Sequence, residues 1–252
     1  MKGRVSLVAH RGQPLSFPEN SLAGYRHAVE AGANYVETDV QICADGVPVL
    51  SHDANLLELS GKQIIIGDHD YSTIARVPLG YSERFGDRFA DFRIATLKEF
   101  AALMADWSDV TCFVELKQAS LQNFGMKAVE LVIEQCSALS DQLVLISFSD
   151  DALEYARARY PDLKIGWVLP EWDDALRRRA DDLEAEYLFI DEEFCPGEAS
   201  DLWSGDWRWV AYTINSADQV AHCASLGIEL IETDRYSELV EESDIVEVST
   251  DF

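Results

Sequence analysis

Charged side chains stand at the ends of several short apolar runs in this sequence. Glu37 and Asp39 end one run and lie two residues apart, and Glu115 and Lys117 end another run with the same spacing. Because alternate residues of a β-strand face the same side, each pair shares one face if its run is a strand. Taken alone, each pair also fits an exposed sheet edge or a surface ion pair. Their convergence in one place would indicate a binding site.

Two histidines accompany these carboxylates. His10 ends the first apolar run, and His52 follows the run Val47–Ser51. An imidazole has an ordinary pKa of about 6.5, so two of them can serve as a general base and a general acid near neutral pH. A lone histidine at a strand end is usually a structural residue, so this hypothesis requires that both histidines meet the carboxylates.

The carboxylates predict a cation site. An all-oxygen set of Glu37, Asp39 and Glu115 suits Mg²⁺ or Ca²⁺ better than zinc, and Mn²⁺ is also possible. The formal charges of these three groups, one divalent cation, Arg11 and Lys117 leave one net positive charge. A phosphodiester monoanion would neutralise that charge, although a carboxylate or enolate substrate fits the balance equally well.

Apolar strands and helical patterns alternate along most of the chain, which predicts an α/β fold with a parallel sheet. The eight predicted strands are Val5–His10, Tyr35–Gln41, Thr111–Lys117, Leu143–Phe148, Ile165–Leu169, Tyr187–Asp191, Trp209–Thr213 and Glu229–Thr233. The predicted helices between them are Ser21–Ala31, Leu97–Asp106, Asn123–Ala138, Asp150–Tyr160, Trp172–Leu183 and Ala217–Leu226. Ser21, Thr96, Asp150 and Ser216 are the expected N-caps. Eight such units favour a single (β/α)8 TIM barrel with its site at the C-terminal strand ends, and an open doubly wound sheet is the alternative.

A ninth strand, Val47–Ser51, follows the turn sequence Asp45-Gly46. Such a dipeptide predicts a two-residue hairpin loop, so the strand should return antiparallel to Tyr35–Gln41 instead of joining the barrel. With this loop, His52 lies opposite Asp39. The hairpin thereby carries a histidine back to the strand end that holds the first pair of carboxylates.

The regular alternation stops between about residues 54 and 95. This stretch has scattered aromatic residues, mixed charges and four glycines, and it is too long for a structureless loop in a compact domain. We expect one domain, residues 1–252, with a small insertion at about 54–95 after the hairpin of the second strand. The insertion would lie over the barrel mouth and limit the size of the substrate.

The chain has 252 residues and a formal net charge of −26 at pH 7. A field of this sign repels nucleic acid and anionic membranes, so we expect neither as a partner. The five cysteines include no Cys-x-x-Cys pair, which argues against a zinc knuckle. No apolar stretch is long enough for a signal peptide or a membrane span, so we expect a cytoplasmic protein without membrane insertion, either a monomer or a homodimer.

In combination, the motifs resemble those of the glycerophosphodiester phosphodiesterase family over almost the whole chain. The matching segments are V-A-H-R-G (Val8–Gly12), P-E-N-S (Pro18–Ser21), E-T-D-V (Glu37–Val40), D-G-V-P-V-L-S-H-D (Asp45–Asp53), A-T-L-K-E (Ala95–Glu99), V-E-L-K (Val114–Lys117), S-F (Ser147–Phe148), Y-T-I-N (Tyr212–Asn215) and I-E-T-D (Ile231–Asp234). The resemblance implies metal-dependent hydrolysis of glycerophosphodiesters, such as glycerophosphocholine or glycerophosphoethanolamine, to glycerol 3-phosphate and an alcohol. It also implies that the glycerol 2-hydroxyl attacks phosphorus and that water then opens a cyclic phosphate.

The resemblance also implies roles for the matching positions. They are acid–base catalysis for His10 and His52, metal binding for Glu37, Asp39 and Glu115, and phosphate binding for Arg11 and Lys117. Glu19, Phe148 and Tyr212 are expected at the substrate, and orienting Arg11 is the alternative role for Glu19. Tyr212 stands where the family usually has tryptophan, and the segment after His52-Asp53 lacks the family's aspartate-rich turn. Both departures bear on which alcohol leaves.

Three alternatives stay open at this point. A lysophospholipase D-like phosphodiesterase of the same fold would need a wide apolar mouth. A catalytically silent barrel that binds a phosphodiester should have lost a histidine or a metal carboxylate. A Mg²⁺-dependent lyase or isomerase would need a Lys or Tyr base facing the metal, and Lys117 is the available candidate.

Overall fold

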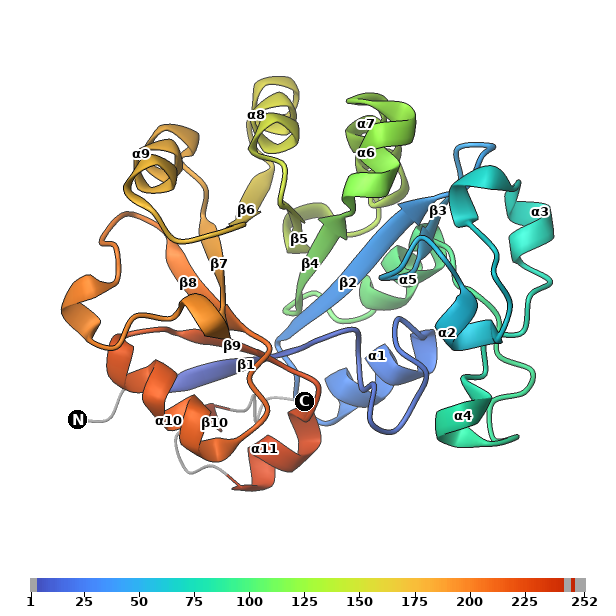
Figure 1. Ribbon diagram of the computed structural model, residues 1–252, viewed down its shortest axis with the longest axis horizontal. Coiled ribbons are helices and arrows are strands. Elements are labelled where there is room, and N and C mark those ends of the chain that lie inside the picture. Colours follow the sequence, from blue (N-terminus) through green and yellow to red (C-terminus); the bar gives the residue numbers. More distant parts are fainter. Residues whose placement is uncertain (1–3, 243–245, 248–252) are drawn as a thin grey trace.

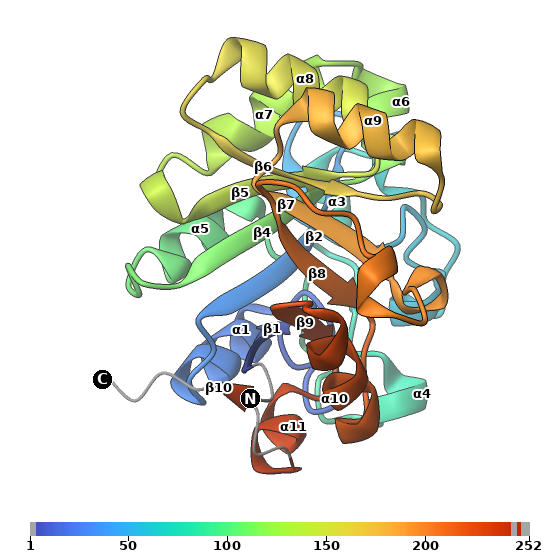
Figure 2. The same ribbon diagram turned by 90° about the vertical axis from the view of Figure 1, so that its left-hand side faces the viewer.

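The computed structural model describes residues 4–242 and 246–247. Eight parallel strands close into a barrel in the order β1-β2-β4-β5-β6-β7-β8-β9, and β9 returns to pair with β1 (Figures 1 and 2). They are β1 (Val5–Ala9), β2 (Tyr35–Ile42), β4 (Thr111–Leu116), β5 (Leu143–Ser147), β6 (Lys164–Val168), β7 (Tyr187–Asp191), β8 (Arg208–Tyr212) and β9 (Leu230–Thr233). The predicted (β/α)8 barrel is confirmed. The expected domain limits at residues 1 and 252 lie outside the described residues.

Helices surround the barrel and connect its strands (Figure 2). They are α1 (Leu22–Glu30), α5 (Leu97–Met104), α6 (Gln118–Phe124), α7 (Lys127–Gln135), α8 (Asp150–Arg159), α9 (Asp174–Leu183), α10 (Ala217–Leu226) and α11 (Tyr236–Glu242). Short 3₁₀ turns are η2 (Ser140–Gln142), η3 (Glu192–Phe194) and η4 (Ala199–Asp201). A two-residue strand, β10 (Val246–Glu247), pairs in parallel with the start of β1.

Two helix predictions are wrong in detail. The predicted helix Asn123–Ala138 is two helices, because Gly125 between α6 and α7 has a φ of 57°, outside the right-handed helical region. The N-cap of α8 is Ser149, whose side chain accepts a hydrogen bond from the Ala152 amide, so Asp150 is the first helical residue. The other three predicted caps are confirmed by the same kind of hydrogen bond.

The hairpin strand β3 (Pro48–Leu50) pairs antiparallel with β2, but its register differs by one residue from the prediction. Gly46, with a φ of 83°, completes a three-residue loop, whereas the prediction assumed a two-residue loop. Ser51 therefore takes the place opposite Asp39, and its amide donates to the Asp39 carbonyl at 3.1 Å. The prediction that His52 lies opposite Asp39 is wrong.

Residues 54–95 form short helices beside β3, at one edge of the molecule (Figure 1). They are α2 (Leu57–Ser60), η1 (Ile66–Asp68), α3 (Tyr71–Ile74) and α4 (Ser82–Phe85). Leu56, Ile66, Ile74 and Leu79 pack into an apolar cluster with Val49 of β3. That this stretch is an insertion into a single domain stays a prediction.

Apolar side chains fill the lower layers of the barrel. Val8, Phe113, Val144, Phe189 and Leu230 meet there in one buried cluster. Polar residues at the C-terminal ends of the same strands therefore stand above an apolar floor. Within the described part of the chain, no helix has the length and apolar character needed to cross a membrane.

Candidate active site

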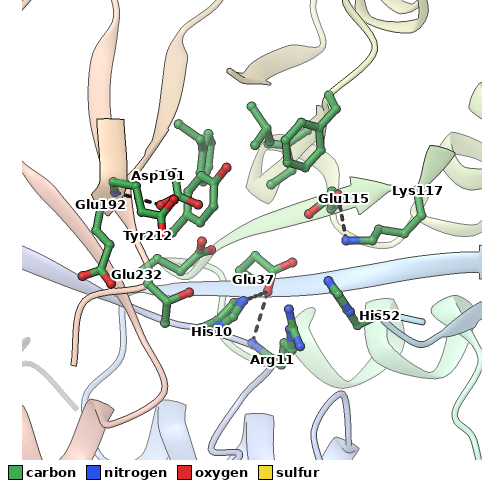
Figure 3. Close-up of a pocket in the computed structure, with 16 residues that line it drawn as sticks. His10, Arg11, Glu37, His52, Glu115, Lys117, Asp191, Glu192, Tyr212 and Glu232 are labelled. Carbon is green, nitrogen blue, oxygen red and sulfur yellow. Dashed lines mark hydrogen bonds and ion pairs between the residues drawn. The ribbon is translucent and has the colours of Figure 1, made fainter. Parts of the chain in front are cut away.

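A pocket of about 420 Å³ opens at the C-terminal ends of the barrel strands (Figure 3). Eight of the ten predicted site residues line it, namely His10, Arg11, Glu37, His52, Glu115, Lys117, Phe148 and Tyr212. The other two, Glu19 and Asp39, lie behind this surface and contact Arg11. The structure therefore brings together all the residues that the sequence nominated.

Glu37, Asp39 and Glu115 form a buried carboxylate triad. One oxygen from each side chain lies within 4.8 Å of the others, and among the described residues this is the one group of three acidic, histidine or cysteine side chains so close together. The cause is the pairing of β2 with β4, which places Asp39 directly beside Glu115. Three oxygen donors at this spacing fit a hard divalent cation.

Two cations hold the triad together. Lys117 Nζ lies 3.0 Å from Asp39 Oδ1 and 2.9 Å from Glu115 Oε1, and Arg11 Nε lies 3.1 Å from Asp39 Oδ2. Burial alone would raise the pKa of Asp39, but Lys117 and Arg11 outweigh burial and hold that pKa well below its ordinary value. These cations therefore stabilise the anionic form of Asp39, and the same attraction raises the pKa of Lys117 despite its burial.

The carboxyl group of Glu37 has fewer compensating partners than that of Asp39. It accepts a hydrogen bond from the Arg11 amide at 3.1 Å through Oε2, while its buried Oε1 has no hydrogen-bond partner. Burial raises the pKa of Glu37 well above its ordinary value, and the charges of Asp39, Glu232 and Glu115 raise it further. An added positive charge at this place would relieve both effects, so the residues present fit a bound cation.

His10 and His52 reach the pocket in similar ways. His10 Nδ1 lies 2.7 Å from Asp234 Oδ1, and His52 Nδ1 lies 2.7 Å from Asp53 Oδ1. Burial lowers the pKa of both imidazoles, and the hydrogen bonds to the aspartates oppose that shift. Since each Nδ1 is engaged by a carboxylate, Nε2 is the nitrogen left for other partners. His10 Nε2 lies 3.9 Å from Glu37 Oε2.

Asn20 fixes the end of β2. Its side-chain oxygen accepts from Tyr25 Oη at 2.8 Å, from Thr38 Oγ1 at 3.0 Å and from the Asp39 amide at 3.1 Å. Its Nδ2 donates to Asp39 Oδ2 at 2.9 Å. Asp39 is thereby held in place from behind the pocket.

Asn215 fixes the end of β9 in the way that Asn20 fixes the end of β2. Its Oδ1 accepts from Thr233 Oγ1 at 2.9 Å and from the Asp234 amide at 3.0 Å, and its Nδ2 donates to Asp234 Oδ2 at 3.4 Å. Sequence reasoning gave neither asparagine a role. A signal for both was present in the sequence, because an Asn-Ser pair precedes each Glu-Thr-Asp segment. Asn20-Ser21 comes before Glu37–Asp39, and Asn215-Ser216 comes before Glu232–Asp234.

Glu232 also received no role from the sequence. It is 4% exposed and lines the pocket from β9, and its Oε1 is buried without a hydrogen-bond partner. Burial raises the pKa of Glu232 well above its ordinary value, and the Glu115 and Asp39 charges add to the rise. The sequence does place Glu232 at the polar end of the eighth predicted strand, and the period-two rule puts it on the face of Leu230, toward the barrel interior.

The residues expected at the substrate occupy two places. Phe148 and Tyr212 form part of the pocket wall, whereas Glu19 Oε2 accepts from Arg11 Nη1 at 3.3 Å from behind. Asp191 lines the side of the pocket near Tyr212 (Figure 3), where its charge raises the pKa of that phenol in addition to burial. The pocket thus has a cationic side at Arg11 and an acidic side at β7.

Solved structures share this fold. A phosphodiesterase of Oleispira antarctica in complex with the product sn-glycerol-3-phosphate superposes with a TM-score of 0.83 at 24% identity, covering 94% of this chain and 96% of that chain. A glycerophosphodiester phosphodiesterase of Thermotoga maritima gives a TM-score of 0.73 at 23% identity, covering 96% of this chain and all of that chain (100%). Both similarities extend over the whole barrel.

Sequence similarity identifies the family of the chain, beyond the fold that it shares with the solved structures. A glycerophosphodiester phosphodiesterase of Caldanaerobacter subterraneus is 26% identical over 236 residues, which is 92% of this chain and 94% of the relative. Human glycerophosphodiester phosphodiesterase 1 is 33% identical over 194 residues, or 75% of this chain and 57% of the relative. The profile of the glycerophosphoryl diester phosphodiesterase family matches residues 10–238. The chain therefore belongs to the glycerophosphoryl diester phosphodiesterase family and is an enzyme that hydrolyses glycerophosphodiesters.

Proposed function

We propose that this hydrolysis depends on a divalent metal and uses His10 and His52 as its acid–base pair. The substrates would be small glycerophosphodiesters such as glycerophosphocholine or glycerophosphoethanolamine, and the products would be glycerol 3-phosphate and the free alcohol. One observation carries the proposal: both histidines line the same pocket as the buried carboxylates Glu37 and Glu115.

Glu37, Asp39 and Glu115 would hold the cation. Their oxygens are within 4.8 Å of one another, and the unpartnered Glu37 Oε1 needs a positive partner. Mg²⁺ or Ca²⁺ suits such hard oxygen donors best, and Mn²⁺ is also compatible with them. The bound cation would supply Lewis acidity that offsets negative charge on the phosphate.

The histidines would move the protons. In the first step, a neutral imidazole accepts the proton of the glycerol 2-hydroxyl as its oxygen bonds to phosphorus. The second, protonated imidazole donates its proton to the departing alkoxide, which leaves as the alcohol and gives a cyclic phosphate. Water then opens the ring to glycerol 3-phosphate with the two proton transfers reversed. Asp234 and Asp53 support these roles. Asp234 binds Nδ1 of His10 and Asp53 binds Nδ1 of His52, so Nε2 of each imidazole is left to exchange the proton.

Arg11 and Lys117 would bind the phosphate oxygens. Both cations are already held beside the triad by carboxylates, so they need little reorganisation to meet the substrate. Glu19 would act through its contact with Arg11. Phe148 and Tyr212 would pack against the carbon skeleton of the substrate.

Release of glycerol 3-phosphate from glycerophosphocholine and glycerophosphoethanolamine tests the proposal. We expect activity to disappear with EDTA and to return with Mg²⁺, Ca²⁺ or Mn²⁺. A parallel assay with lysophosphatidylcholine controls for substrate class. Faster hydrolysis of the lysophospholipid would favour a lysophospholipase D-like enzyme, and activity that persists in EDTA would refute the metal requirement. Absence of turnover of either diester with any of the three metals would refute these two compounds as substrates.

A further inference from the structure

Glu232 is a buried carboxylate of the pocket to which the proposed mechanism gives no task. Its side chain points into the pocket from β9, on the side of Tyr212 (Figure 3). The residue is 4% exposed, and Oε1 has no hydrogen-bond partner. A buried carboxyl group without a hydrogen-bond partner is costly in either protonation state, and a hydrogen-bonding ligand in the pocket would offset that cost.

The neighbours of Glu232 do not explain its charge. Directly beside it on β1 is Val8, and two residues before it is Leu230, both in the apolar interior of the barrel. The nearby cations already have carboxylate partners. Arg11 is paired with Glu19 and Asp39, and Lys117 with Asp39 and Glu115. No donor to Glu232 Oε1 is present among the described residues, so a molecule in the pocket would have to supply it.

Three kinds of donor are available to a pocket that binds a glycerophosphodiester: a metal ion, an ammonium group on the leaving alcohol, and a glycerol hydroxyl. The metal is the weakest candidate, because the clustered carboxylate oxygens belong to Glu37, Asp39 and Glu115 and not to Glu232. An ammonium group occurs only in some substrates and belongs to the part that must depart to solvent. The glycerol part stays attached to phosphorus through both steps, so a carboxyl group that is only 4% exposed suits it better.

We infer that Glu232 binds the terminal hydroxyl of the glycerol moiety and thereby selects substrates in which that hydroxyl is free. The inference rests on the proposed function, because it takes a glycerophosphodiester as the substrate. The 2-hydroxyl is the nucleophile, so the terminal hydroxyl is the one left to donate to Glu232. A lysophospholipid acylated at this position brings no donor, and binding it would leave the carboxylate buried and unpaired. Sites built to accept a hydrogen bond reject such analogues strongly.

A truncated substrate tests this role. Glycerophosphocholine is compared with 2-hydroxyethyl phosphocholine, which keeps the attacking hydroxyl and the leaving group but lacks the terminal hydroxymethyl group. We expect the native enzyme to prefer glycerophosphocholine by about 10- to 100-fold in kcat/KM, the range for a hydrogen bond to a charged group. Glu232→Leu should lose that preference through a lower rate on glycerophosphocholine, and Glu232→Gln should keep part of it. Glu193→Gln is the matched control, because it removes another pocket-lining acid that is exposed.

Binding of the products gives a second readout that does not require turnover. By calorimetry, the native protein should bind glycerol 3-phosphate more tightly than 2-hydroxyethyl phosphate, and Glu232→Leu should bind both alike. A preference that survives in Glu232→Leu, in either assay, would overturn the inference. So would a Glu232→Leu variant that instead loses a native preference for choline over an uncharged leaving alcohol. A native enzyme that hydrolyses neither diester would refute the proposed function, and calorimetry would still decide the role of Glu232.

Discussion

His10 and His52 are each held through Nδ1 by an aspartate, but the two pairs differ in exposure. The Asp234 side chain is 34% exposed and meets a nearly buried imidazole, whereas the Asp53 side chain is 57% exposed and meets a half-buried one. Charge interactions that are exposed to water are screened and contribute little. The two histidines should therefore depend on their aspartates to different degrees.

Loss of either imidazole should stop most of the turnover. We predict that His10→Ala and His52→Ala each lower kcat by roughly 10²-fold or more, the usual contribution of a general acid or base. Because neither histidine belongs to the carboxylate triad, both variants should bind the divalent cation almost as the native protein does. Steady-state kinetics and metal titration measure the two effects. Near-native kcat in either variant would refute the assignment.

Loss of an orienting aspartate should matter more at His10. We predict that Asp234→Asn lowers kcat by about tenfold or more, because the better-buried hydrogen bond fixes the imidazole for proton transfer. Asp53→Asn serves as the comparison and should lower kcat less. The pH dependence of kcat/KM should also shift in Asp234→Asn. If Asp234 had only a structural role, its loss would leave this pH dependence unchanged. Equal effects of the two substitutions would contradict this account.

The sequence predicted the residues that end apolar strands, such as Glu37, Glu115 and Lys117, because period-two alternation shows which side chains share a face. It did not predict partners far apart in the chain. Asp234 binds His10 across 224 positions, and no strand pattern reveals such a contact. Glu232 stood in a predicted strand, but its lack of a partner is visible only once the surrounding side chains are placed.

Element boundaries depend on single residues that strand and helix patterns do not determine. The observed hairpin register differs from the predicted one because the loop has three residues, with Gly46 in the left-handed region. This difference of one residue places Ser51 opposite Asp39, where His52 was expected. His52 nevertheless lines the pocket, because it follows the strand and is not part of its ladder. One helix became two at Gly125 for a similar reason.

The capping motif at the N-terminus of α5 allows a test of how much a local sequence signal contributes to the stability of the barrel. Thr96 Oγ1 accepts from the Glu99 amide at 3.2 Å, and Glu99 Oε2 accepts from the Thr96 amide at 2.8 Å, which makes a capping box. We predict that Thr96→Ala lowers the free energy of unfolding by about 1 kcal/mol. Urea unfolding measures the change. Ser72→Ala, at an exposed helical serine, is the control, and an equal loss in both variants would show that the cap is not the cause.

Across the whole molecule, the five cysteines differ in the environment of their thiols. Burial raises the pKa of Cys43 and Cys136 to about 12 and raises that of Cys112 as well. A hydrogen bond between Cys195 and Cys223 lowers the pKa of the first thiol and raises that of the second. Because the thiolate is the reactive form, Cys195 should be alkylated first by iodoacetamide at pH 8. Mass spectrometry of the native protein checks this order, and equally fast labelling of Cys136 would contradict it.

Charge also acts at the scale of the whole molecule. A net charge of −26 repels an anionic substrate, so binding depends on positive charge concentrated at the pocket. Arg11 and Lys117 supply part of that charge, but they are shared with Asp39, Glu19 and Glu115. The bound cation is therefore the central requirement of the proposed mechanism.

Calorimetric titration of the EDTA-treated protein with Mg²⁺ and Ca²⁺ tests that requirement most directly. We predict one site per chain, with affinity at least about tenfold lower in Glu115→Gln, since even residues behind the metal ligands typically contribute 10- to 100-fold. Asp191→Asn, which removes a pocket acid outside the triad, should bind almost as the native protein does. Equal metal affinity in the native protein and in Glu115→Gln would contradict the account.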